Sequence, residues 1–158
     1  MEGADNQNET ALKDALRLHQ QGLLDDAEKI YRSLLKSQPG NPAVLHFLGV
    51  LCHQRGDLAE AMDCFEKSLA RNPNSTDTQF NLGVVFHQSG KFEEAATAYR
   101  RALTLEPANV EPAYNLGNVL QELGRFDEAA SAYETFLERN PENIVARYNL
   151  GLAYMRAH

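Results

Sequence analysis

The chain has 158 residues, of which 43% are hydrophobic, and a formal net charge of −7. A chain of this length can bury a sizeable core within one domain. The acidic balance argues against a nucleic-acid partner, for which a basic stripe is expected, and no run of about 18 apolar residues is present to span a membrane. The N-terminus also lacks the apolar stretch of a signal peptide. We therefore expect a cytoplasmic protein that binds neither nucleic acid nor membrane.

Residues 1–7 are polar and acidic, and we expect them to form a short disordered tail. After this tail, five kinds of residue recur at a fixed interval of 34 residues. The five columns are Gly22, Gly56, Gly90 and Gly124; Ala27, Ala61, Ala95 and Ala129; Tyr31, Phe65, Tyr99 and Tyr133; Pro39, Pro73, Pro107 and Pro141; and Gly49, Gly83, Gly117 and Gly151. A 34-residue period is that of a helix–turn–helix solenoid. It divides the chain into repeats 1 to 4 (residues 8–41, 42–75, 76–109 and 110–143) and a partial repeat, 144–158.

Each repeat carries the signals of two helices joined by a tight turn. In repeat 2, apolar residues recur at three- and four-residue steps over 43–54, which indicates an amphipathic helix. Gly56 is suited to end that helix, because glycine tolerates left-handed geometry. A second helix is expected over 58–71, and Pro73 stops it. We expect the glycine at position 8 and the alanine at position 20 of each repeat to face each other, since only small side chains let the two helices cross closely.

The columns resemble the pattern of the tetratricopeptide repeat (TPR) family, which has Leu-Gly at positions 7 and 8, Ala at 20, an aromatic residue at 24, a small residue at 27 and Pro at 32. The Leu-Gly pairs here are Leu48-Gly49, Leu82-Gly83, Leu116-Gly117 and Leu150-Gly151. Repeat 1 departs from the pattern with Asp14-Ala15, and bulky Leu34 and Phe136 occupy position 27. The resemblance implies an all-α fold, a right-handed TPR superhelix (α-solenoid) of antiparallel helix pairs.

In such a superhelix the first helix of each repeat lines the concave surface, to which positions 2, 5, 6, 9, 12 and 13 point. The resemblance therefore implies a peptide-binding groove, for which the candidate residues are Asn81, Asn115, Asn149, Phe47, Phe80, Tyr114, Tyr148, His53, His87 and Asn118. An asparagine side chain offers both a donor and an acceptor, so a row of them could hold an extended peptide by its backbone. The row is similar to the asparagine ladder of the O-linked N-acetylglucosamine transferases and their bacterial relatives. The alternative is that these asparagines satisfy backbone groups within the protein.

One TPR subtype binds acidic chaperone tails through basic residues spread over three repeats. In the frame that starts at repeat 2, this chain has His46 and Val50 at the first two positions and Glu111 and Asn115 at the later basic ones. The clamp is absent in this frame and in the others. We therefore expect an uncharged or mildly basic segment as the ligand.

The position-12 column His19, His53 and His87 raises the question of a metal site. Zinc binds imidazole nitrogen at about 2 Å, whereas neighbouring helix axes pack about 8–10 Å apart. Three such histidines cannot share one ion, so we expect no metal. The sequence also has no phosphate-binding glycine loop and no nucleophile elbow. We predict neither cofactor nor catalytic residues.

The partial repeat supplies a first helix, expected over 146–156, without a second helix to cover Leu150, Ala153 and Tyr154. The chain is then either the N-terminal part of a longer protein or covered there by another copy. Our main prediction is a non-catalytic protein–protein interaction scaffold that binds an extended peptide in its concave groove. The alternatives are the substrate-recognition arm of a larger enzyme, such as a glycosyltransferase, and a module that self-associates through the uncapped C-terminal helix.

Overall fold

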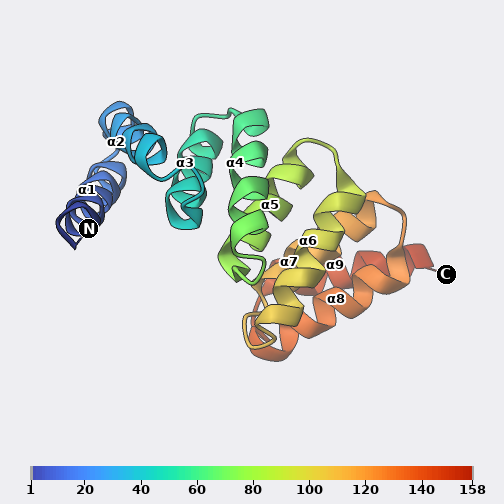
Figure 1. Ribbon diagram of the computed structural model, residues 1–158. Helices are drawn as coiled ribbons and strands as arrows, with labels where there is room; N and C mark the ends of the chain where they lie inside the picture. The colour runs from blue at the N-terminus through green and yellow to red at the C-terminus, as the bar shows by residue number, and fades with distance from the viewer. Residues whose placement is uncertain (1, 158) are drawn as a thin grey trace. The chain divides into compact units, whose positions relative to one another are not determined.

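The structure, a computed structural model, describes residues 2–157, and their side chains from Gln7 onward. In this part the chain forms nine α-helices and no strand, and it divides into two compact units, residues 1–73 and 74–158 (Figure 1). The first unit contains α1 (Glu2–Gln20), α2 (Leu24–Ser37), α3 (Pro42–Gln54) and α4 (Leu58–Arg71). The second contains α5 (Thr76–Gln88), α6 (Phe92–Leu105), α7 (Glu111–Glu122), α8 (Phe126–Arg139) and α9 (Ile144–Ala157).

Helix α1 begins at Glu2, so it includes most of the segment for which the sequence predicts a disordered tail. Met1, the first residue of that predicted tail, lies outside the described residues. The segment contains no proline, and therefore nothing in its backbone chemistry prevents the hydrogen-bond ladder of the helix from extending to it. Helix α1 therefore begins six residues before residue 8, where repeat 1 begins in the sequence pattern.

The turns between paired helices have the geometry that the glycine column predicts. Gly22, Gly56, Gly90 and Gly124 have φ between 71° and 81°, and no other described residue has a positive φ. At Gly56 the amide donates to His53 O over 2.9 Å, and the next amide, of Asp57, donates to Cys52 O over 2.9 Å. These bonds satisfy carbonyls at the end of α3, as in a Schellman motif.

Helix boundaries follow the local signals closely. The predicted helix 58–71 is α4, and 43–54 is α3, which starts one residue earlier at Pro42. Proline is favoured in the first turn of a helix, where its missing N–H is not needed. The side chain of Asn41 caps this helix by accepting from Ala43 N at 3.0 Å and Val44 N at 3.2 Å.

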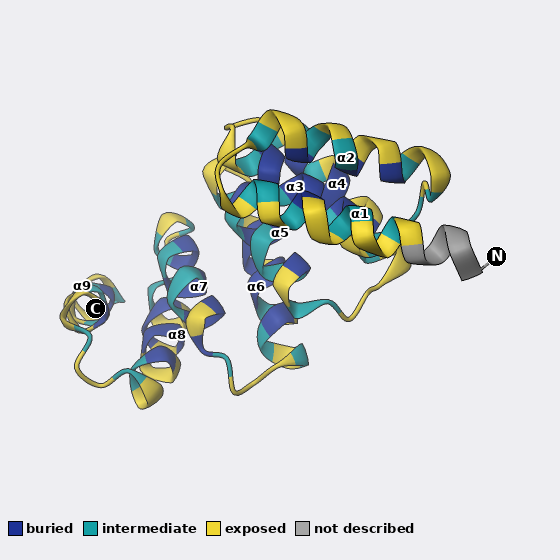
Figure 2. Cartoon of the chain, turned by 90° about the vertical axis from the view of Figure 1, so that its left-hand side faces the viewer, coloured by how far each residue is buried: buried dark blue, intermediate teal, exposed yellow. Residues whose placement is uncertain are grey.

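The core lies between the paired helices, where each second helix presents its position-24 ring to a first helix. Tyr31, Phe65, Tyr99 and Tyr133 are all fully buried, and Figure 2 shows buried residues along the inner sides of the helices. In repeats 2 to 4 the atoms nearest to a Cβ on the position-8 glycine belong to this ring, a contact that we did not anticipate from the sequence. A Cβ on Gly83 would lie 2.7 Å from Cε1 of Tyr99. Glycine is required there because the ring occupies the space of a side chain.

Candidate functional site

The ten predicted groove residues divide between the two units. Phe47 and His53 lie on α3 in the first unit. The other eight lie on the first helices of the second unit and make up what we call the first-helix surface: Phe80, Asn81 and His87 on α5, Tyr114, Asn115 and Asn118 on α7, and Tyr148 and Asn149 on α9. All three asparagines of the position-6 column therefore belong to one compact unit.

Asn149 and Asn118 take part in a hydrogen-bond network inside the protein. The Tyr133 hydroxyl donates to Asn118 Oδ1 over 2.7 Å, and Asn149 Nδ2 lies 3.4 Å from the same oxygen. Gln121 Nε2 donates to the Tyr133 hydroxyl over 3.0 Å and to the backbone oxygen of Asn149 over 3.2 Å. Asn149 Nδ2 also lies 3.5 Å from the Tyr114 hydroxyl. The network joins α7, α8 and α9, so part of the hydrogen-bonding capacity of these two asparagines is used within the protein.

Asn81 and Asn115 differ from Asn149 although all three occupy position 6. Both are half-buried, and neither carboxamide has a hydrogen-bond partner within the described residues. A carboxamide offers two donors and an acceptor. The carboxamides of Asn81 on α5 and Asn115 on α7 therefore differ from that of Asn149, which is bonded within the protein.

The aromatic residues of the predicted set pack mainly against the position-24 rings. The ring centroids of Phe80 and Tyr99 are 5.9 Å apart, as are those of Tyr114 and Tyr133, and Tyr114 also lies 5.2 Å from Phe136. In the first unit, Phe47 stacks on Tyr31 with centroids 6.4 Å apart. Tyr148 is different, because 65% of it is exposed.

The position-12 residues contact the position-24 column in two repeats. His19 Nδ1 and the Tyr31 hydroxyl are 3.2 Å apart, and His19 Nε2 lies 3.0 Å from Gln54 Oε1. His87 instead lies edge-on to Phe92, with centroids 5.8 Å apart. Within the described part of the chain, no three His, Cys, Asp or Glu side chains are grouped as a metal site would need.

Sequence reasoning overlooked the hydroxyl groups of the position-24 tyrosines. Burial raises the pKa of Tyr31 to about 12, and it raises the pKa of Tyr99 and of Tyr133 well above the ordinary value. These hydroxyls therefore stay neutral near pH 7. The signal that could have revealed them is Tyr in place of Phe at position 24, together with His or Gln at position 12 of the same repeat.

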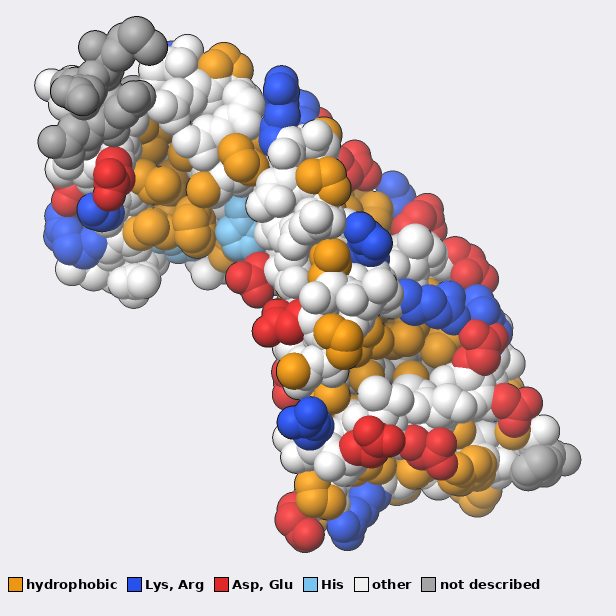
Figure 3. Space-filling model, turned by 60° about the horizontal axis from the view of Figure 1, so that its bottom comes forward, with side chains coloured by type: hydrophobic (Ala, Val, Ile, Leu, Met, Phe, Trp, Pro, Cys, Tyr) orange, Lys and Arg blue, Asp and Glu red, His pale blue; other side chains and the backbone are white. Residues whose placement is uncertain are grey.

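Away from the first-helix surface, opposite charges pair both within repeats and between neighbouring repeats. Arg32 donates to Glu28 and Glu60, each over 2.7 Å. In the second unit, Arg100 and Arg125 both reach Glu128. Acidic and basic side chains lie next to each other on the face drawn in Figure 3. Pairs this exposed contribute little stability each.

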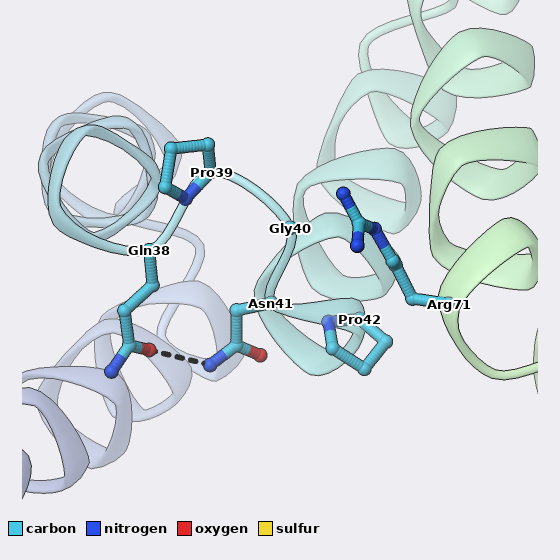
Figure 4. A pocket seen from close by; sticks show the side chains of 6 residues that line it. All are labelled: Gln38, Pro39, Gly40, Asn41, Pro42 and Arg71. Carbon is cyan, nitrogen blue, oxygen red and sulfur yellow. Dashed lines mark hydrogen bonds between the residues drawn. The ribbon is translucent and has the colours of Figure 1, made fainter.

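A pocket of about 580 Å³ in the first unit lies outside the predicted site. It is lined by the segment between α2 and α3 and by Arg71 at the end of α4 (Figure 4). Asn41 Nδ2 donates to Gln38 Oε1 over 2.7 Å at its edge. The Arg71 guanidinium lies against Gly40, since a Cβ there would be 3.0 Å from Nε.

Within residues 2–157, four glycine turns join eight helices into pairs, and a ninth helix, α9, packs on α8. In repeats 2 to 4 the position-24 ring lies against a glycine of the first helix. These features define an all-α tetratricopeptide-repeat solenoid. Three family models agree: two described as tetratricopeptide repeat match residues 18–83 and 114–157, and one described as TPR repeat matches 85–124. No helix in residues 2–157 is both long and apolar enough to cross a membrane.

Among solved structures, the chain is similar to the MamA protein, with 26% identity and a TM-score of 0.90 over 95% of this chain and 82% of that one. A second MamA structure gives 28% identity and a TM-score of 0.85, over 89% and 82% of the two chains. YrrB, described as a TPR protein with an unusual peptide-binding site, has 26% identity and a TM-score of 0.86, over 92% and 75%. A comparison with curated proteins found no match.

Proposed function

We propose that this TPR solenoid is a non-catalytic protein-interaction scaffold whose first-helix surface binds an extended peptide segment. The observation that carries the proposal is the pair Asn81 and Asn115, which occupy the same position one repeat apart and have no hydrogen-bond partner within the described residues. Each can pair with both sides of a peptide group. The half-buried rings of Phe80 and Tyr114 precede them in sequence and supply apolar contact.

Two further observations support this proposal. The neighbour YrrB, at 26% identity, is described as having a peptide-binding site. The first-helix surface itself carries no Lys, Arg, Asp or Glu among its eight members, which suits an uncharged segment. Specificity like that of the O-linked N-acetylglucosamine transferases lacks comparable support, because Asn149 of the asparagine column is used within the protein. The cytoplasmic location stays a prediction from the sequence.

The test is selection of binding peptides from a random display library on the wild-type chain, followed by calorimetry with the selected peptides. The variant Asn81→Ala/Asn115→Ala should bind them on the order of tenfold or more weakly, since each amide contributes roughly 0.5–1.5 kcal/mol per hydrogen bond. A matched control is Thr104→Ala/Thr135→Ala, because these exposed hydroxyls on α6 and α8 bond only to their own helices. Equal affinity of the asparagine variant and the wild type would contradict the proposal.

A second candidate function, self-association through α9, is favoured by the exposure of that helix. Ile144, Tyr148 and Met155 are 79%, 65% and 72% exposed, and they lie at helical spacing with Gly151. A Cβ on Gly151 would meet nothing within 4 Å, whereas its equivalents in repeats 2 to 4 are covered by rings. Ala153, which we expected to face a missing partner, is fully buried instead, because α9 packs on α8.

The partner proposed for this face is a second copy, whose Tyr148 ring can fill the space over Gly151. Light scattering over a concentration series should show a dimer that Tyr148→Glu converts to a monomer. Tyr148 makes no hydrogen bond within the described residues, so the substitution leaves the fold intact. A wild-type chain that stays monomeric at all concentrations would exclude this function.

A further inference from the structure

The hydroxyl of Tyr99 is the exception among the three position-24 tyrosines. The Tyr31 hydroxyl contacts His19, and the Tyr133 hydroxyl bonds to Asn118 and Gln121. Tyr99 is fully buried, and its hydroxyl has no hydrogen-bond partner among the residues that the structure describes. Buried polar groups are nearly always satisfied, so an orphaned hydroxyl calls for a physical explanation.

The rings of Tyr99 and Tyr133 enter their first helices in the same way. A Cβ on Gly83 would lie 2.7, 2.8 and 3.1 Å from Cε1, Cδ1 and Cζ of Tyr99. The corresponding distances from Gly117 to the same atoms of Tyr133 are 2.6, 2.8 and 2.8 Å. Because Cζ carries the hydroxyl, the Tyr99 hydroxyl emerges at the place on α5 that the Tyr133 hydroxyl occupies on α7.

The side chains around these equivalent places differ in chemistry. The polar side chains around the Tyr133 hydroxyl are those of Asn118, Gln121 and Asn149, which bond to the hydroxyl or to one another. The residues at the same repeat positions around Tyr99 are Val84, His87 and Asn115.

The valine side chain has no polar atom, so it cannot accept the kind of hydrogen bond that Asn118 accepts in the next repeat. His87 lies against Phe92. Asn115 makes no hydrogen bond within the described residues. The hydrogen bonds that join the polar side chains around Tyr133 therefore have no counterpart around Tyr99 among the described residues.

We propose that Tyr99 and Asn115 form a subsite, bordered by His87, that hydrogen-bonds the backbone of the bound segment. This inference rests on the proposed peptide-binding function and fixes where along the first-helix surface a backbone group is held. The Tyr99 hydroxyl donates to the peptide carbonyl, and Asn115 Oδ1 accepts from the adjacent peptide N–H. The ligand thus supplies the partner that Asn118 supplies in repeat 4.

Access to the hydroxyl requires one side chain to turn. Position 12 borders the hydroxyl in repeats 1 and 4, as the contacts of His19 and Gln121 show. His87 at position 12 is half-buried, and its only described ring contact is with Phe92. Rotation of its imidazole uncovers the hydroxyl when a peptide binds.

The first variant to make is Tyr99→Phe, with Tyr133→Phe as its matched control. Removal of an unpartnered hydroxyl leaves the free protein as stable as the wild type or more so, whereas removal of the bonded hydroxyl of Tyr133 lowers the urea midpoint. Calorimetry with a peptide selected on the wild type should show about tenfold weaker binding to Tyr99→Phe, the loss of one well-made hydrogen bond. Unchanged affinity in a folded Tyr99→Phe chain overturns the inference.

A second variant, Val84→Asn, restores the internal partner found in repeat 4. It should raise the urea midpoint and weaken peptide binding, and the rise should vanish in the Val84→Asn/Tyr99→Phe double variant. A rise that persists without the hydroxyl contradicts the proposed geometry.

The outcomes separate this inference from the function on which it rests. Weaker binding by Asn81→Ala/Asn115→Ala with normal binding by Tyr99→Phe overturns the subsite alone. If the library yields no peptide, N-methylacetamide serves as the probe, because it is the smallest molecule with a complete peptide group. Its titration should shift the Tyr99 ring resonances in the wild type but leave those of Tyr133 in place. No shift at Tyr99 overturns the subsite, and failure of the library selection counts against the peptide-binding function.

Discussion

A comparison of Gly117→Ala with Gly151→Ala measures how much stability is lost when a methyl group is placed where a ring packs on a first helix. Both occupy position 8 of a first helix in the second unit. A Cβ on Gly117 would lie 2.6 Å from Cε1 of Tyr133, whereas one on Gly151 would have no neighbour within 4 Å. Contacts below 3.0 Å are essentially never made by real Cβ atoms, so Gly117→Ala forces Tyr133 to move.

The expected free energies of unfolding follow from two effects. Replacing Gly by Ala inside a helix stabilises it by about 1 kcal/mol at either site. Overpacking a core costs about 1–3 kcal/mol, and the upper part of this range applies because Tyr133 is fully buried and its hydroxyl is held by Asn118 and Gln121. Gly117→Ala should therefore be about 1–2 kcal/mol less stable than the wild type, and Gly151→Ala about 1 kcal/mol more stable.

Urea unfolding followed by far-ultraviolet circular dichroism measures both variants against the wild type. Because both substitutions lie in one compact unit, they affect the same transition even if the two units unfold separately. The reasoning is refuted if Gly117→Ala proves as stable as Gly151→Ala, since ring packing would then impose no requirement for glycine.

Three further perturbations have expected outcomes. Asn41→Ala removes the cap of α3 and should cost about 1 kcal/mol of unfolding free energy in urea, and an unchanged midpoint would show that the cap is dispensable. The hydrogen bond from Arg32 lowers the pKa of Glu28 below its ordinary value of 4.5. The ionised carboxylate therefore stabilises the folded chain above pH 4.5, and this contribution is lost as the pH falls. Glu28→Gln should have a lower free energy of unfolding than the wild type at pH 7, and the difference should disappear in acid. A gap that is equal at pH 7 and pH 3 would contradict this linkage. Cys52 and Cys64 are free and buried, and their thiols should react with Ellman's reagent only as fast as the chain unfolds; rapid reaction of the native protein would contradict their burial.

The repeat boundaries, the helix pairs and the glycine turns could be predicted from the sequence because each depends on local chemistry. Gly56 adopts a positive φ that other residues avoid, and α4 ends at Arg71, two residues before Pro73. The identity of the packing partner could not be predicted in the same way. We did not anticipate from the sequence that the position-24 ring reaches the glycine at position 8 from the neighbouring helix.

The asparagine column shows most clearly what the sequence by itself determined and what the tertiary structure decided. The sequence placed Asn81, Asn115 and Asn149 at one repeat position and thereby made them equivalent. The structure separates them, because Asn149 meets Asn118 on α7 whereas Asn115 has no partner within the described residues. The physical reason is that a hydrogen bond depends on side chains brought together from different helices, and a repeat pattern specifies the spacing of those helices without specifying the side chains between them.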